Sequence, residues 1–214
     1  MSKYKLSYIE DDDGVKREMV AHFMEDFDVV NIPLYENNTP LYKEVKELAE
    51  DVVNAKLDAV VIDYSFVDKT YDIKFTGADL VAELGNIMPY FPVFILSGKV
   101  DAERSVSDVN LVYVKKDYLA NAKSLNTRIK LQIENYKKRL RDCESRLQVL
   151  IAKASKEALS IQEEEELISL DDFLEKSHCS TISVPASLKK SSNAEKLNKL
   201  IEDTETLIKD IEKK

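Results

Sequence analysis

The first half of the chain is predicted to form an α/β domain with a doubly wound, five-stranded parallel sheet, and the second half a long helix followed by a small all-α region. Up to about residue 116, short apolar runs alternate with amphipathic stretches, which is the pattern of strands and helices in a parallel sheet. No glycine follows Gly98, and a heptad-like apolar pattern begins beyond residue 118. These observations separate a mixed first half from a helical second half.

Five strands and three helices are expected in the first half. Segments 58–63 and 92–97 are apolar on both sides, as is typical of buried parallel strands. Segment 14–26 places Val15, Met19 and Phe23 on one helical face, while Pro33 and the segment ENNTP break the chain. The expected strands are 4–9, 27–32, 58–63, 92–97 and 111–116, and the expected helices are 14–26, 41–55 and 77–87, with one helical turn around 101–107.

The second half shows apolar residues at alternating spacings of four and three, which is typical of a coiled-coil seam. A helix from about residue 118 to 160 would be roughly 60 Å long. It pairs either with a second copy in a homodimer, which is preferred, or with the chain's own last helix. A loop over 178–193 and a final helix to about residue 212 are expected, giving domains 1–122, 123–160 and 161–214. The seam residues are Ile129, Ile133, Tyr136, Leu140, Cys143, Leu147, Leu150 and Ala154.

Composition and charge exclude several classes of protein. The net charge is −9, and the first 118 residues hold 13 Lys and Arg against 23 Asp and Glu. Such an acidic half argues against a nucleic-acid partner and suits a hard cation. No run of about 18 apolar residues occurs, so no membrane-spanning segment is expected. Two cysteines, Cys143 and Cys179, give no disulfide framework or zinc site and favour a cytoplasmic setting.

Polar residues follow several of the expected strands. Because the carboxyl ends of parallel strands meet at one edge of a sheet, these side chains are expected to converge there. Phosphoryl transfer to a carboxylate needs a fixed acceptor, a divalent cation, a hydroxyl and an ammonium group. Carboxylates with an open coordination position suit Mg²⁺. The edge residues are Glu10, Asp11, Asp12, Asp13, Asp63, Ser97, Lys115 and Lys116.

Four segments carry a family resemblance. YIEDDD, AVVIDYS, VFILSGK and YVKKD resemble the signature segments of response-regulator receiver domains, over roughly residues 3–125. The resemblance implies a flavodoxin-like fold, a phosphoacceptor at Asp63, and Mg²⁺ as cofactor. It implies Mg²⁺ ligands at Glu10, Asp11, Asp63 and the backbone carbonyl of Ser65, a switch pair at Ser97 and Tyr113, and a catalytic lysine at Lys116, with Lys115 as the alternative.

The chain departs from the receiver pattern at three places. Val67 stands where the family has a proline four residues after the acceptor. The segment between Asp63 and Gly77 is longer than usual, and the segment after Ser97 is short. The short segment after Ser97 indicates a shortened or reoriented fourth helix. In the receiver family this helix commonly transmits the response to phosphorylation.

The leading hypothesis is a phosphorylation-responsive signalling protein. A sensor histidine kinase or phosphotransfer protein would donate the phosphoryl group, and the output would be dimerisation or a protein partner of the C-terminal helices. The chain would catalyse only its own phosphorylation and dephosphorylation. The alternative is a constitutive pseudo-receiver scaffold whose coiled coil works without phosphorylation.

Two further functions are set aside. A haloacid-dehalogenase-like phosphatase needs a second aspartate two residues after the nucleophile, where Ser65 stands. DNA binding is not expected, because a basic run on a helix is usually the solvated face of a coiled coil. That run contains Lys137, Lys138, Arg139, Arg141 and Arg146.

Overall fold

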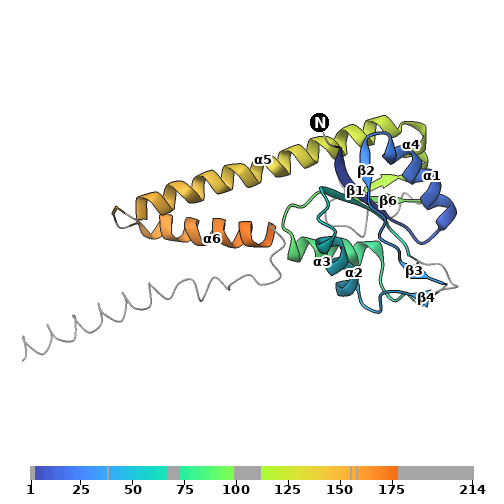
Figure 1. Ribbon diagram of the computed structural model, residues 1–214, viewed down its shortest axis with the longest axis horizontal. Helices are drawn as coiled ribbons and strands as arrows, with labels where there is room; N and C mark the ends of the chain where they lie inside the picture. Colours follow the sequence, from blue (N-terminus) through green and yellow to red (C-terminus); the bar gives the residue numbers. More distant parts are fainter. Residues whose placement is uncertain are drawn as a thin grey trace, which may run out of the picture. The chain divides into compact units, whose positions relative to one another are not determined.

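The computed structural model describes residues 3–37, 39–66, 73–98, 112–154, 156–157 and 159–177 (Figure 1). It divides into two compact units, Met1–Asp142 and Cys143–Lys214. Val67, the helical turn expected around 101–107, the loop over 178–193 and the final helix lie outside the described residues.

A five-stranded sheet runs through the first unit in the order β2-β1-β5-β6-β7. Each pair of neighbouring strands is parallel. With the short hairpin strands β3 and β4 left out, the order is that of the flavodoxin-like doubly wound fold. The prediction of an α/β fold with a five-stranded parallel sheet is therefore confirmed. The strands are β1 (Tyr4–Ile9), β2 (Phe27–Val29), β5 (Ala59–Asp63), β6 (Val93–Ser97) and β7 (Val112–Val114).

Every residue of the central strands β5 and β6 is buried, in agreement with their continuous apolar sequences. The edge strands are shorter than expected. β2 ends at Val29 and β7 ends at Val114, whereas the sequence predicted strands to residues 32 and 116. An edge strand has a neighbour on one side only, and short edges are common because they limit unpaired backbone.

Helices α1 (Asp13–Met24) and α3 (Gly77–Ile87) agree closely with the prediction. The carboxylate of Asp12 caps α1 and accepts hydrogen bonds from the amides of Gly14 and Val15 at 2.7 and 2.9 Å. The cap fixes the start of α1 three residues after Glu10.

Helix α2 (Val45–Asn54) begins four residues later than predicted. The residues before it form a small antiparallel hairpin of β3 (Tyr35–Glu36) and β4 (Thr39–Pro40). Its turn contains Asn37 with a φ of 50°, a conformation that Asn tolerates better than most residues. The segment that the sequence identified as a chain break is therefore this hairpin.

The sheet of the first unit carries helices on both faces (Figure 1). Helices α2 and α3 pack against each other on one face. α1 and α4 (Lys115–Ala120), with the beginning of α5 (Ala122–Ala154), cover the other. The core on this second face draws from seven elements and includes Leu6, Tyr8, Met19, Phe23, Phe94, Tyr118 and Ile129.

The beginning of α5 belongs to the core of the first unit. Leu125, Ile129 and Ile133 are almost fully buried there, beside Phe23 and Tyr118. The sequence had placed Ile129 and Ile133 in a coiled-coil seam beyond a domain boundary at residue 122. A four-residue apolar spacing fits a helix packed on a sheet as well as it fits a heptad, and here the chain itself covers these positions.

Truncation of Ile129 tests this extension of the core. Ile129→Ala is expected to lower the free energy of unfolding by about 3 kcal/mol, as is usual for removing a buried branched side chain. Leu131→Ala is the matched control. Leu131 lies two residues further along α5, on the opposite face of the helix, with 54% of its surface exposed. Its effect should stay within about 0.5 kcal/mol. Urea unfolding monitored by circular dichroism measures both values, and equal effects would contradict the burial of Ile129.

The second unit contains the end of α5 and helix α6 (Ile161–Ser177). Arg146 forms two hydrogen bonds with Glu166, at 2.8 and 2.6 Å, and Lys153 pairs with Glu163 at 2.6 Å. The later residue of α5, Lys153, pairs with the earlier residue of α6, Glu163. The two helices are therefore antiparallel. Leu150 is buried in this unit, which supports intrachain packing at that seam position.

The EEEE run at 163–166 begins near the first turn of α6. Acidic side chains are favourable near a helix N-terminus, because the unpaired amides there carry partial positive charge. None of the helices in the described part of the chain is both long and apolar enough to cross a membrane.

Candidate functional site

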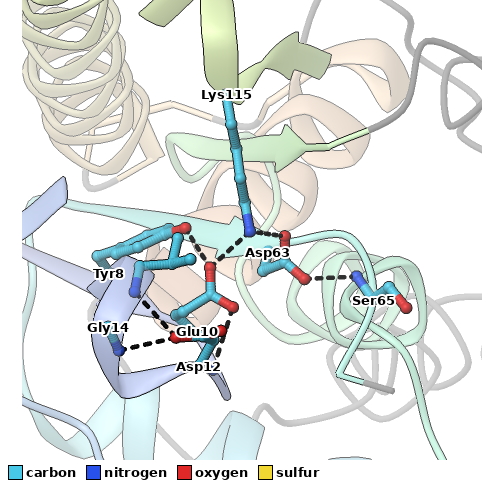
Figure 2. Close-up of polar contacts among 8 residues, drawn as sticks. Tyr8, Glu10, Asp12, Gly14, Asp63, Ser65 and Lys115 are labelled. Carbon is cyan, nitrogen blue, oxygen red and sulfur yellow. Dashed lines mark hydrogen bonds and ion pairs between the residues drawn. The ribbon is translucent and has the colours of Figure 1, made fainter. Parts of the chain in front are cut away.

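The carboxylates of Glu10, Asp11 and Asp63 meet at the carboxyl ends of β1 and β5, and Figure 2 shows two of them, Glu10 and Asp63. Ile9 at the end of β1 pairs with Ile62 of β5, so Glu10 and Asp63 follow on neighbouring strands. Glu10 and Asp63 are buried, with 3% and 5% of their surfaces exposed. One oxygen from each of Glu10, Asp11 and Asp63 lies within 4.8 Å of the other two. The convergence expected for these three residues is present.

The ammonium group at this site belongs to Lys115. Its Nζ lies 2.6 Å from Oε2 of Glu10 and 2.6 Å from Oδ1 of Asp63. Lys116, which the family spacing favoured, is exposed, and the structure corrects that choice. The physical reason is that β7 ends at Val114 and α4 begins at once, so Lys115 is the first residue beyond the strand.

The carboxylate of Asp63 is held on both oxygens. Lys115 contacts Oδ1, and the backbone amide of Ser65 donates a hydrogen bond to Oδ2 at 2.9 Å (Figure 2). Ser65 therefore contributes its N–H group to the carboxylate of Asp63. The backbone carbonyl of Ser65 as a metal ligand stays a prediction.

The electrostatics of the cluster favour a cation. Burial raises the pKa of Asp63, and the charge of Glu10 adds to this effect, although Lys115 and the Ser65 amide oppose it. Burial also raises the pKa of Asp11 to about 7, with further contributions from Glu10 and Asp63. Burial opposes the charge on Lys115, but its hydrogen bonds to Asp63 and Glu10 outweigh burial and raise its pKa.

A divalent cation fits this donor set. Three buried or half-buried carboxylates lie together and Lys115 pairs with two of them, so negative charge exceeds positive charge within this group of four side chains when all are ionised. Carboxylate oxygens are the ligands that Mg²⁺ prefers in proteins. The cluster of Glu10, Asp11 and Asp63 could therefore hold a metal ion.

The predicted switch residues lie on the strands beyond β5. Ser97 is buried at the carboxyl end of β6, beside β5, at the same edge of the sheet as Asp63. Tyr113 is half-buried on β7, and its ring lies 6.2 Å from that of Phe94. Nη1 of Arg128, from α5, donates a hydrogen bond to the Tyr113 hydroxyl at 3.3 Å. Tyr113 thus links the last strand of the sheet to α5.

Two residues at the site were not predicted. The hydroxyl of Tyr8 donates a hydrogen bond to Oε2 of Glu10 at 2.5 Å. Burial raises the pKa of Tyr8, and the charge of Glu10 adds to the effect, so the phenol stays a donor. The sequence indicates this contact only through the two-residue spacing of Tyr8 and Glu10, because residues two apart along an extended strand lie on the same face.

Gly77 is the second unpredicted residue. Its amide donates a hydrogen bond to the carbonyl of Tyr64 at 3.1 Å. A Cβ atom at residue 77 would lie 1.9 Å from the backbone carbonyl oxygen of Asp63. Only glycine permits this approach of α3 to the strand end that carries Asp63. The sequence places Gly77 at the end of a loop but does not indicate its close contact with the backbone of Asp63.

Comparison with known proteins shows no shared sequence family. No protein-family model and no curated protein matches the chain. One similar solved structure is the RcsB response regulator of Salmonella typhimurium, with 14% identity, a TM-score of 0.43, and coverage of 90% of this chain and 100% of that chain. Another is a fusion carrying the yeast Spc42 trimeric coiled coil, with 17% identity, a TM-score of 0.47, and coverage of 73% and 99%.

These likenesses are weak, and the sheet itself is the stronger observation. The five-stranded parallel sheet and its strand order fit the fold of receiver domains.

Proposed function

We propose that the chain is a phosphorylation-responsive signalling protein whose α/β domain accepts a phosphoryl group on Asp63. The observation that carries the proposal is the group of three carboxylates within 4.8 Å of one another, with Lys115 bound to Asp63. This group lies at the carboxyl edge of the sheet, where doubly wound folds place their ligands.

Asp63 is the proposed nucleophile. One of its oxygens forms a bond to phosphorus as the phosphorus–nitrogen bond of a phosphohistidine donor breaks, and the electron pair returns to the imidazole nitrogen. Lys115 and the Ser65 amide hold the two oxygens of Asp63 and limit its rotation. A fixed nucleophile lowers the entropic cost of an in-line transfer.

Mg²⁺ is the proposed cofactor, held by Glu10, Asp11, Asp63 and the backbone carbonyl of Ser65. When bound, it supplies positive charge that offsets the carboxylates and the phosphoryl oxygens. The ammonium of Lys115 contributes to the same charge balance from the chain itself.

The proposed donor is a sensor histidine kinase or a phosphotransfer protein. Ser97 and Tyr113 are proposed to shift when Asp63 is phosphorylated, which biases a pre-existing equilibrium between two states. The hydrogen bond between Arg128 and Tyr113 supports α5 as the next element to respond. The proposed output is a protein partner of the C-terminal helices or a homodimer, and no other enzymatic activity is assigned.

Intact-mass measurement after incubation with phosphoramidate and Mg²⁺ tests the proposal. We expect a mass gain of one phosphoryl group that disappears with EDTA and in Asp63→Asn. Asp28→Asn is the matched control, because Asp28 is an exposed aspartate on β2, and it should be phosphorylated like the unaltered protein. No mass gain with any donor would contradict the proposal and support a constitutive scaffold.

A further inference from the structure

Tyr8 places a neutral hydrogen-bond donor beside the acidic cluster. The residue lies on β1, two positions before Glu10, and only 1% of its surface is exposed. Its hydroxyl is 2.5 Å from Oε2 of Glu10. A hydrogen bond to a buried charged group is among the stronger kinds in proteins, because water cannot replace it.

The ring of Tyr8 is held by the aromatic core. It packs against Phe23 of α1 at a centroid distance of 5.8 Å, and Phe23 in turn stacks on Tyr118 of α4 at 5.0 Å. Side chains packed in this way seldom change rotamer. The direction of the Tyr8 hydroxyl is therefore fixed by groups that do not belong to the acidic cluster.

The two oxygens of Glu10 are used unequally. Oε2 accepts from Tyr8 at 2.5 Å and from Lys115 at 2.6 Å. Oε1 accepts from the backbone amide of Asp12 at 3.3 Å, which is a long hydrogen bond. Each carboxylate oxygen has two lone pairs, so the two short contacts saturate Oε2. Asp11 also forms a side-chain hydrogen bond with Glu10. That bond cannot persist between two ionised carboxylates that hold a cation, which leaves Oε1 as the oxygen with a free lone pair.

We infer that Tyr8 is a positioning residue for the cation site: its hydroxyl holds Oε2 of Glu10 and leaves Oε1 as the oxygen with capacity for a metal ion. This inference rests on the proposed function for the identity of the cation. Without the hydroxyl, Lys115 alone holds Oε2, and Glu10 gains freedom to rotate or to draw Lys115 away from Asp63. Groups that orient a metal ligand in this way typically contribute about 10-fold to 100-fold in metal affinity.

Calorimetric titration with Mg²⁺ tests the inference, using the full chain and Tyr8→Phe. This variant removes one oxygen and keeps the ring that packs against Phe23. The dissociation constant for Mg²⁺ is expected to rise about 10-fold to 100-fold. Tyr4→Phe is the matched control on the same strand, since Tyr4 contacts Lys137 through its ring face at 4.6 Å, and its dissociation constant should equal that of the unaltered protein.

A double-mutant cycle separates positioning from a general effect on the fold. If Tyr8 acts through Glu10, Tyr8→Phe should change the Mg²⁺ affinity much less in a Glu10→Gln background. Circular dichroism in EDTA checks that each variant is folded. An unchanged affinity in folded Tyr8→Phe, or an equal loss in the Glu10→Gln background, would overturn the inference.

The same titration separates the inference from the proposed function. If the unaltered protein binds Mg²⁺ but takes no phosphoryl group, the proposed function fails while the affinities still decide the role of Tyr8. If it binds no Mg²⁺, both fail. If it is phosphorylated, the Mg²⁺ concentration for half-maximal rate should rise in Tyr8→Phe while the rate at saturating Mg²⁺ changes little, a separation that simple destabilisation would not produce.

Discussion

Replacing Lys115 by glutamine is expected to lower the free energy of unfolding by about 4 kcal/mol in EDTA, because it leaves buried carboxylates without their compensating charge. The Lys115 side chain is only 19% exposed, and it contacts both Glu10 and Asp63 at 2.6 Å. Added Mg²⁺ should recover part of the lost stability, since a cation at the cluster offsets the same negative charge. Phosphorylation of Asp63 should be lost or strongly slowed.

Lys116→Gln provides the matched control for this prediction. Lys116 is adjacent in sequence and has the same side chain, but it is exposed. Its replacement should leave both the unfolding midpoint and the phosphorylation rate unchanged. Urea unfolding with and without Mg²⁺ measures the stability of both variants. A larger effect of Lys116→Gln than of Lys115→Gln would contradict the assignment of the lysine.

Gly77→Ala is expected to destabilise the protein by about 3 kcal/mol and to impair phosphorylation. The added Cβ would lie 1.9 Å from the carbonyl oxygen of Asp63 and 2.9 Å from Cγ2 of Ile62. The first of these atoms belongs to the backbone, so the strand end or the start of α3 must move, and forced movement in a packed core typically costs about 1–3 kcal/mol or more. The displaced group is the backbone of Asp63, the proposed phosphoacceptor.

Gly85→Ala in the same helix should have the opposite sign. A Cβ at residue 85 would meet no atom within 4 Å, and alanine restricts the unfolded chain more than glycine does. This change should stabilise the protein by about 0.4–1 kcal/mol. Thermal unfolding measured side by side compares the two variants, and similar effects of the two changes would show that the close contact at Gly77 is not decisive.

The fold of the first unit could largely be predicted from the sequence. The apolar runs at 58–63 and 92–97 form the two fully buried strands β5 and β6. Strands with apolar residues on both faces are stable only where both faces are covered. The meeting of Glu10 and Asp63 followed from one rule, that parallel strands end at a shared edge. This rule needs only the order of the elements and no knowledge of side-chain positions.

The remaining features depended on lengths and distances that the sequence does not specify. Lys115 and Lys116 differ by one residue, and the end of β7 at Val114 decides between them. Ile129 and Ile133 have a spacing that suits a coiled coil and a sheet-packing helix equally, so only the tertiary structure shows that they are buried in the domain core. The contact of Tyr8 with Glu10 likewise required side-chain geometry.

Identification of the phosphorylated residue tests the central claim most directly. An aspartyl phosphate is reduced by borohydride to homoserine, which peptide mass mapping then locates. After incubation of the full chain with phosphoramidate and Mg²⁺, we predict homoserine at residue 63 and none when EDTA is present. Homoserine at another aspartate, or none at all in protein that is folded and binds Mg²⁺, would contradict Asp63 as the phosphoacceptor.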